Sequence, residues 1–118
     1  MKPKAAERPE RWSVDAGTCE VARLDIPADA HRERTFELFF ALVVQNCSAV
    51  EGATHGLRVL VNGALEWSRS VPTHPGAGDT LDLRLQLTVP AGLPLRLTAI
   101  SEVNSAVRMR LTITADES

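Results

Sequence analysis

The 118-residue sequence has no tyrosine, and its three phenylalanines and two tryptophans make up only 4% of it. The phenylalanines share one apolar stretch, which leaves only Trp12 and Trp67 to offer a ring to a ligand. Sugar-binding surfaces depend on such rings because the apolar face of a sugar stacks on them. The scarcity of aromatic residues therefore counts against a carbohydrate-binding module, which we keep as the alternative function.

The sequence also lacks a strong charge of either sign and a long apolar run. Its formal net charge is -2, and its arginines are spread over many segments, so we expect no nucleic-acid partner. No apolar run approaches the roughly 18 to 20 residues that cross a bilayer, so we expect a soluble protein without a membrane partner. The charged N-terminus has no apolar signal-peptide core, which predicts a cytoplasmic protein, with a processed secreted form as the alternative.

Local motifs for catalysis or metal binding are missing as well. His31, His55 and His74 lie in predicted loops at no ligand spacing, and no Cys-x-x-Cys or Gly-x-Ser-x-Gly pattern occurs. We therefore expect no enzyme activity, no metal and no cofactor. For Cys19 and Cys47 we favour buried free thiols over a single disulfide.

The chain is instead organised around the run from Thr35 to Asn46. From Leu38 to Val44 its residues are apolar at both parities, which is typical of a central strand covered on both faces. A helix is the alternative, but the run is short, aromatic and β-branched, and a glycine-containing loop follows it. The chain length fits one domain at residues 16–118, preceded by a polar tail at residues 1–15 that we expect to be flexible.

Asn62-Gly63 is the strongest hairpin signal. A two-residue turn would place Glu66 on the same face as the valines before it. A three-residue loop that pairs Val59 with Leu65 keeps the apolar side chains on one face, so we predict that register.

Strict alternation follows in the second half of the chain. Leucines alternate with polar residues from Leu81 to Val89, and similar patterns occupy 95–103 and 107–114. Two turns would join these segments into a three-stranded meander with Val107 and Met109 on its core side. With about seven strands and no convincing helix, the sequence predicts an all-β fold, an antiparallel β-sandwich or jelly roll.

The outer face of that meander is the first candidate site. It would carry a contiguous polar row, formed by Arg84, Arg96, Thr98, Arg108, Arg110 and Thr112. A solvated sheet face explains such a row, and recognition of a partner is the functional interpretation.

The second candidate site consists of loops at 47–56 and 71–80. They would supply ligand contacts from His55, His74 and Asp79, with Trp12 as a further contact. From these two sites we predict a non-catalytic module that binds another protein or its own copies through a sheet face or an unpaired edge strand. The alternative is a lectin-like carbohydrate-binding module that uses the two loops.

Overall fold

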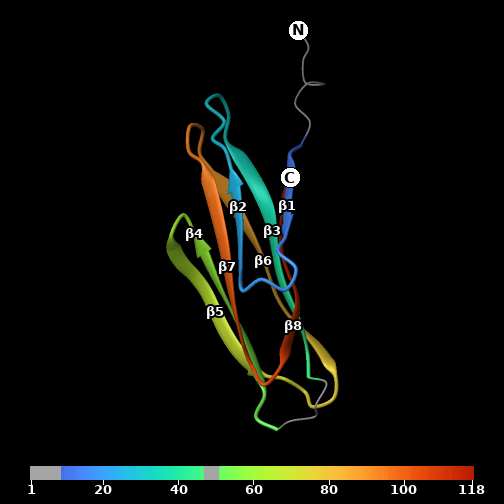
Figure 1. Ribbon diagram of the computed structural model, residues 1–118. Helices are drawn as coiled ribbons and strands as arrows, with labels where there is room; N and C mark the ends of the chain where they lie inside the picture. The colour runs from blue at the N-terminus through green and yellow to red at the C-terminus, as the bar shows by residue number, and fades with distance from the viewer. Residues whose placement is uncertain (1–8, 47–50) are drawn as a thin grey trace.

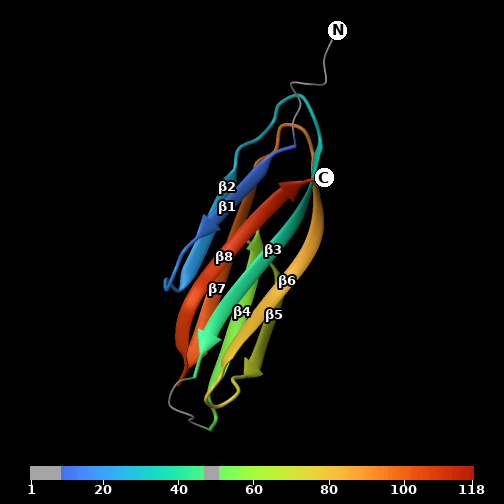
Figure 2. The same cartoon turned by 90° about the vertical axis from the view of Figure 1, so that its right-hand side faces the viewer.

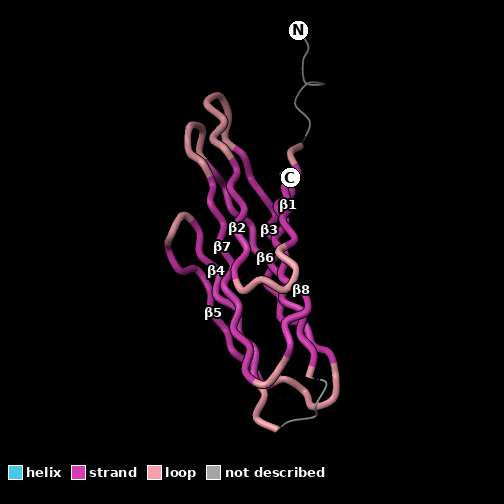
Figure 3. The backbone as a smooth tube through the Cα atoms, in the orientation of Figure 1, coloured by secondary structure: helices cyan, strands magenta, loops and turns pink. Residues whose placement is uncertain are grey.

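The computed structural model describes residues 9–46 and 51–118, which form strands and connecting loops without a helix (Figures 1 and 3). The eight strands in this part of the chain are β1 Arg11–Asp15, β2 Val21–Ile26, β3 Arg34–Gln45, β4 Thr54–Val61, β5 Ala64–Pro72, β6 Gly78–Val89, β7 Leu95–Asn104 and β8 Val107–Glu117. No helix among the described residues is long and apolar enough to cross a membrane.

The strands form two four-stranded antiparallel sheets that pack face to face. One sheet has the order β1-β8-β3-β6, and the other has the order β2-β7-β4-β5. Figure 1 shows the two layers nearly edge-on, and Figure 2 shows the first sheet from its outer side. The predicted antiparallel β-sandwich is confirmed, with one strand more than the seven expected.

The central position predicted for the apolar run is also confirmed. β3 pairs with β8 on one side and with β6 on the other. Its inward side chains are at most 1% exposed, and they are Phe36, Leu38, Phe40, Leu42 and Val44. On the outer face, the guanidinium of Arg84 lies 4.3 Å from the centre of the Phe39 ring and covers it. The second apolar parity is therefore shielded by neighbouring side chains, without a third layer.

The predicted meander is wrong. β6 belongs to the first sheet, β7 to the second and β8 to the first, so neither connection in this segment makes a hairpin. Alternation shows which side chains of a strand are apolar, but it does not show which strand lies beside it. Two such strands also bury their apolar faces when they lie opposite one another in different sheets.

The predicted register of the hairpin is wrong as well. Asn62 and Gly63 have φ angles of 50° and 85°, as in a two-residue type I′ turn, and Val61 pairs with Ala64. A two-residue turn without a bulge would place Glu66 on the same face as the valines of β4. A β-bulge in β5 removes this conflict. Leu60 pairs with Leu65 and Val59 with Trp67, so Glu66 is the extra residue.

A second bulge explains why Val107 and Met109 are exposed, against our prediction of core positions. Val43 pairs with Arg110 and Val44 with Arg108, which leaves Met109 without an opposite residue. One extra residue reverses the parity of a strand, so Arg108 points inward and Met109 outward.

The N-terminal region also differs from the prediction. Arg11–Asp15 forms β1 and pairs with β8, so the strands begin earlier than residue 16. Residues 1–8 of the predicted tail lie outside the described residues. Cys19 is a free thiol but is exposed, which corrects our prediction of burial, and Cys47 lies outside the described residues.

Candidate functional site

The two sheets leave four edge strands. They are β1 and β6 in the first sheet, and β2 and β5 in the second. β1 and β2 are short and contact one another, which closes that side of the sandwich. β5 and β6 are longer and lie along the opposite side (Figure 2). Any binding by strand addition would therefore use this second side.

β6 presents a long regular edge. It has twelve residues and pairs with β3 from end to end without a bulge. Its inward leucines Leu83, Leu85 and Leu87 are only half-buried, whereas the inward residues of the neighbouring β3 are fully buried. The core therefore continues to the edge of the sheet and is incompletely covered there.

β5 covers this region poorly. Trp67 and Val71 pack against the core but stay half-buried, and Arg69, which faces the same way, is exposed. We call the edge of β6 together with the half-buried side chains of β5 and β6 the open side. It combines unpaired backbone groups with apolar surface, and both are features of protein interaction sites.

The predicted arginine and threonine row is divided by the fold. Arg84, Arg110 and Thr112 lie on the outer face of the first sheet, where Arg110 forms an ion pair with Asp15 at 3.1 Å. Arg96 and Thr98 lie on the outer face of the second sheet. The six residues therefore do not form one contiguous face.

Arg108 takes a position between the sheets. Its Nε donates a hydrogen bond to Ser101 Oγ at 2.6 Å, and Ser101 is fully buried. This contact ties the start of β8 to the end of β7 across the sandwich and gives Arg108 a structural role.

Two of the four residues predicted in the ligand loops come together at one end of the sandwich. His55 belongs to β4 and Asp79 to β6, and their Nε2 and Oδ2 atoms lie 3.9 Å apart. His55 Nδ1 is hydrogen-bonded to Thr73 Oγ1 at 2.7 Å, and both side chains are buried. His55 is therefore not the solvated loop residue that the sequence suggested.

Burial lowers the pKa of His55 below its usual value, and the Asp79 carboxylate opposes this effect in part. Its Nε2 has no hydrogen-bond partner among the described residues. The Thr73 hydroxyl lies beside this base and carboxylate, but Thr73 and His55 are both buried, at 3% and 1% exposure, and neither is open to a substrate. Within residues 9–46 and 51–118, no three side chains of the metal-ligating types gather into a group. The arrangement is thus a buried polar contact between the sheets.

His74 and Trp12 lie apart from this pair. His74 is exposed in the loop between β5 and β6. Trp12 is half-buried in β1 and packs against the core, and its indole nitrogen donates to Glu10 Oε1 at 3.0 Å. Neither tryptophan presents a fully exposed ring.

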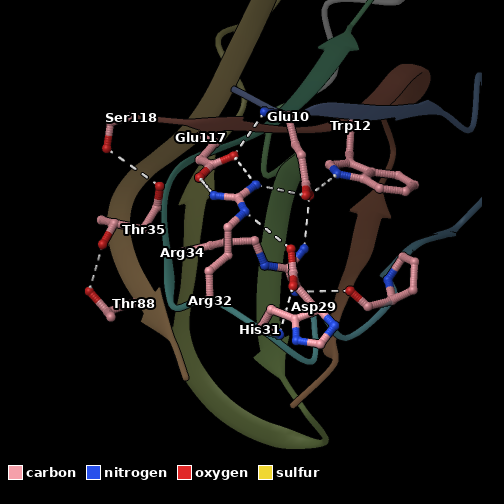
Figure 4. A network of polar contacts seen from close by, with 11 residues as sticks. Glu10, Trp12, Asp29, His31, Arg32, Arg34, Thr35, Thr88, Glu117 and Ser118 are labelled. Atoms are coloured by element: carbon pink, nitrogen blue, oxygen red, sulfur yellow. Dashed lines mark hydrogen bonds and ion pairs between the residues drawn. The ribbon is translucent and has the colours of Figure 1, made fainter. Parts of the chain in front are cut away.

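Trp12 belongs to a polar network at the other end of the sandwich, shown in Figure 4. Arg32 forms ion pairs with Glu10, Asp29 and Glu117, and Arg34 forms one with Glu10 at 2.8 Å. The network joins the residue before β1, the loop between β2 and β3, and the end of β8.

Two acidic members of the network, Asp29 and Glu117, are stabilised in their charged forms. The hydrogen bond from Arg32 lowers the pKa of Glu117, and a backbone hydrogen bond from His31 lowers the pKa of Asp29. Arg34 is only 2% exposed, donates to the carbonyl of Pro27 at 2.9 Å and lies over the Phe36 ring. Because these charged side chains form ion pairs with one another, we infer that they stabilise the fold.

A groove of about 750 Å³ lies beside the turn of the β4–β5 hairpin. Arg96 and Asp25 form an exposed ion pair at 3.0 Å within it, and Asn62 accepts a hydrogen bond from the Arg96 backbone at 2.8 Å. The lining is otherwise mostly apolar and consists of Ile26, Pro27, Gly63, Leu93, Pro94 and Leu95. Of the predicted site residues, Arg96 alone lines this groove.

Comparison with known proteins identifies the fold and no sequence family. No protein-family model matches the chain, and no curated protein matches it. The dimeric latent form of PorU from Porphyromonas gingivalis aligns with 90% of this chain at 14% identity and a TM-score of 0.57. The alignment covers 10% of the PorU chain, so this chain spans about a tenth of that protein's length.

Two further structures align along nearly their whole lengths. Eiger TNF from S. frugiperda shares 9% identity over 93% of this chain and 92% of its own, with a TM-score of 0.52. A family 35 carbohydrate-binding module from Clostridium thermocellum shares 9% identity over 90% of this chain and 97% of its own. Its TM-score of 0.43 is too low to support a structural argument. At these identities the likeness extends to the sandwich fold, which hosts many functions.

Proposed function

We propose that this protein is a non-catalytic interaction module that assembles with protein through the open side of its sandwich. The long, regular edge of β6 is the observation that carries the proposal. Natural β-proteins protect such edges with short strands, bulges, prolines or inward-pointing charges. Between Leu81 and Val89, β6 has no bulge, proline or inward-pointing charge, and its two charged residues, Asp82 and Arg84, point to the outer face. Bulges do interrupt the pairing of β4 with β5 and of β3 with β8.

The apolar surface beside the edge supports the same function. Strand addition supplies backbone hydrogen bonds, and side chains at alternate positions add apolar contact. The half-buried Leu83, Leu85 and Leu87 stand at such alternate positions, and Trp67 offers further apolar surface on β5. A partner strand beside β6 would therefore satisfy its edge and cover its leucines together.

Sedimentation velocity over a range of protein concentrations tests this function. We expect the wild-type protein to form a reversible assembly and Leu85→Lys to sediment as a monomer, because a buried charge in the interface is unfavourable. Leu60→Lys is the matched control, since Leu60 is also a half-buried leucine but lies in β4, away from the open side. Thermal unfolding of each variant verifies that it is folded.

Two results would contradict the proposal. One is a wild-type protein that remains monomeric at every concentration. The other is an assembly that Leu60→Lys disrupts and Leu85→Lys leaves intact, which would place the contact on the outer face of the second sheet.

A carbohydrate ligand is the second candidate, and the groove beside the β4–β5 turn favours it. The Asp25–Arg96 pair and the Asn62 side chain offer charged and amide groups to hydroxyls beside apolar walls. Neither tryptophan lines this groove, so NMR titration with a panel of monosaccharides is the suitable test. We expect shifts in the Asn62 and Arg96 amides that Asp25→Ala removes. Unchanged spectra across the panel would exclude this ligand class from the groove.

A further inference from the structure

The four edges differ in how well each would serve as a pairing surface. β1 has five residues and β2 has six, so each offers few backbone groups. β5 is longer, but the bulge at Glu66 interrupts it and Pro72 ends it. β6 has twelve residues and regular pairing. Of the described edges, β6 is the one best suited to continue its sheet into another strand.

The charges of β6 are self-complementary. Asp82 and Arg84 are two residues apart, so both point to the outer face, on either side of the inward Leu83. Two antiparallel copies of this strand centred on Leu83 would place Asp82 of each copy opposite Arg84 of the other. Asp82 makes no ion pair within the part of the chain that the structure describes, and Arg84 contacts the Phe39 ring. The carboxylate is thus available to a second copy.

Other registers lose this complementarity. A register that places inward residues of one copy opposite outward residues of the other would bury polar side chains. The twofold axis must therefore pass through a residue, so that inward residues pair with inward residues. Centring on Asp82 or Arg84 places like charges opposite one another, which is unfavourable. Centring on Leu85 pairs Asp82 with Thr88 and Arg84 with Gln86, and forms no ion pair. Leu83 is therefore the centre at which both charges of each copy find a partner.

We propose that the occupant of the open side is a second copy of this chain, bound through antiparallel pairing of β6 with β6 about Leu83. This inference rests on the proposed function and specifies its partner and register. The contact is isologous, so it closes into a twofold dimer with no free β6 edge. The two β1-β8-β3-β6 sheets become one continuous sheet, and Leu81 of each copy lies opposite Leu85 of the other.

Charge reversal tests the ion pairs. We expect Asp82→Arg to weaken dimerisation by about tenfold or more, because it places two arginines opposite one another at both symmetric positions. Arg84→Asp should weaken it similarly, and the double variant Asp82→Arg/Arg84→Asp should recover most of the loss relative to either single variant. Equal weakening in the single and double variants would contradict the register. Dissociation constants from sedimentation equilibrium provide the comparison.

Cysteine cross-linking in a Cys19→Ser/Cys47→Ser background is the decisive experiment. Residues directly opposite in an antiparallel pair have Cα atoms about 4.5 to 5.5 Å apart, a separation that a disulfide spans. We expect Leu83→Cys to form covalent dimers on mild oxidation. Asp82→Cys mixed with Arg84→Cys should form mixed dimers, and these two exposed positions serve if Leu83→Cys fails to fold. Ser13→Cys in β1 is the control edge and should remain monomeric.

The outcomes separate this inference from the function on which it rests. Cross-linking at position 83 and between positions 82 and 84 supports the register. An assembly that cross-links through Arg84→Cys alone, through Ser13→Cys, or at none of these sites overturns the β6 register and leaves the interaction module standing. A wild-type chain that is monomeric at every concentration overturns both.

Discussion

His55 shows how a single residue is placed by contacts that its local sequence does not encode. It follows a glycine-containing loop, yet it enters β4 pointing inward and meets Thr73 and Asp79, which come from later segments. The sequence predicts His55 and Asp79 as residues of two separate loops. Their pairing depends on β4 and β6 lying in opposite sheets, which no local pattern encodes.

The buried histidine makes stability depend on pH. Because burial lowers the pKa of His55, the unfolded chain binds its proton at a higher pH than the folded protein does. The stabilisation is fully present above the ordinary pKa of about 6.5 and is lost as the pH falls from there through the folded value. A difference of one pH unit between the two pKa values corresponds to about 1.4 kcal/mol.

We therefore expect His55→Gln to flatten the fall in the free energy of unfolding as the pH is lowered below about 6.5. Urea unfolding at several pH values measures this slope. His74→Gln, at an exposed histidine, is the control and should keep the wild-type slope. A His55→Gln slope that equals the wild-type slope would show that this histidine does not set the pH dependence.

Arg34 is the second residue whose environment sets its effect. Its guanidinium is 2% exposed and satisfies both Glu10 and the Pro27 carbonyl. We expect Arg34→Ala to lower the free energy of unfolding by on the order of 2 kcal/mol, because it leaves the Pro27 carbonyl without this donor and removes one of the donors to Glu10. Arg96→Ala removes an exposed ion pair and should have little effect. Similar losses in the two variants, measured by urea unfolding, would contradict this difference.

At the scale of elements, the turn of the β4–β5 hairpin was predictable and its register was not. Asn62-Gly63 is a local signal because both residues tolerate positive φ. The bulge at Glu66 has no such signal. It reflects packing of Trp67 against the core, which depends on the opposite sheet.

The turn gives a sharp test of backbone conformation. Gly63 has a φ of 85°, so we expect Gly63→Ala to cost about 1 to 2 kcal/mol even though a Cβ there would meet nothing within 4 Å. Gly78→Ala is the matched control. Its backbone does not have positive φ, and its Cβ would contact the Val44 carbonyl oxygen at 3.6 Å. Equal thermal stabilities for the two variants would contradict the type I′ turn.

The alternation in β6 likewise identified a strand but not its place. Leucines at every second position from Leu81 to Leu87 indicate one apolar face, and the structure turns them inward. The sequence between Leu81 and Val89 does contain a signal for an edge that can pair, because it has no proline and no charged residue at its inward positions. That signal becomes informative only when the neighbours of the strand are known.

For the whole molecule, composition and periodicity predicted the sandwich, whereas topology decided the candidate site. The predicted row of arginines and threonines assumed that β6, β7 and β8 were neighbours. Their alternation between two sheets divides that row and leaves β6 at an edge. Long-range pairing of this kind results from the burial of the whole core, so local patterns do not determine it.

Hydrogen exchange measured at low and high protein concentration tests the role of the open side most directly. The account predicts that amides of β6 exchange more slowly as the concentration rises, because assembly adds partners to its free backbone groups. Amides of β1, the other edge of the same sheet, should exchange at the same rate throughout. Exchange in β6 that is independent of concentration, or protection that appears in β1 instead, would contradict the account.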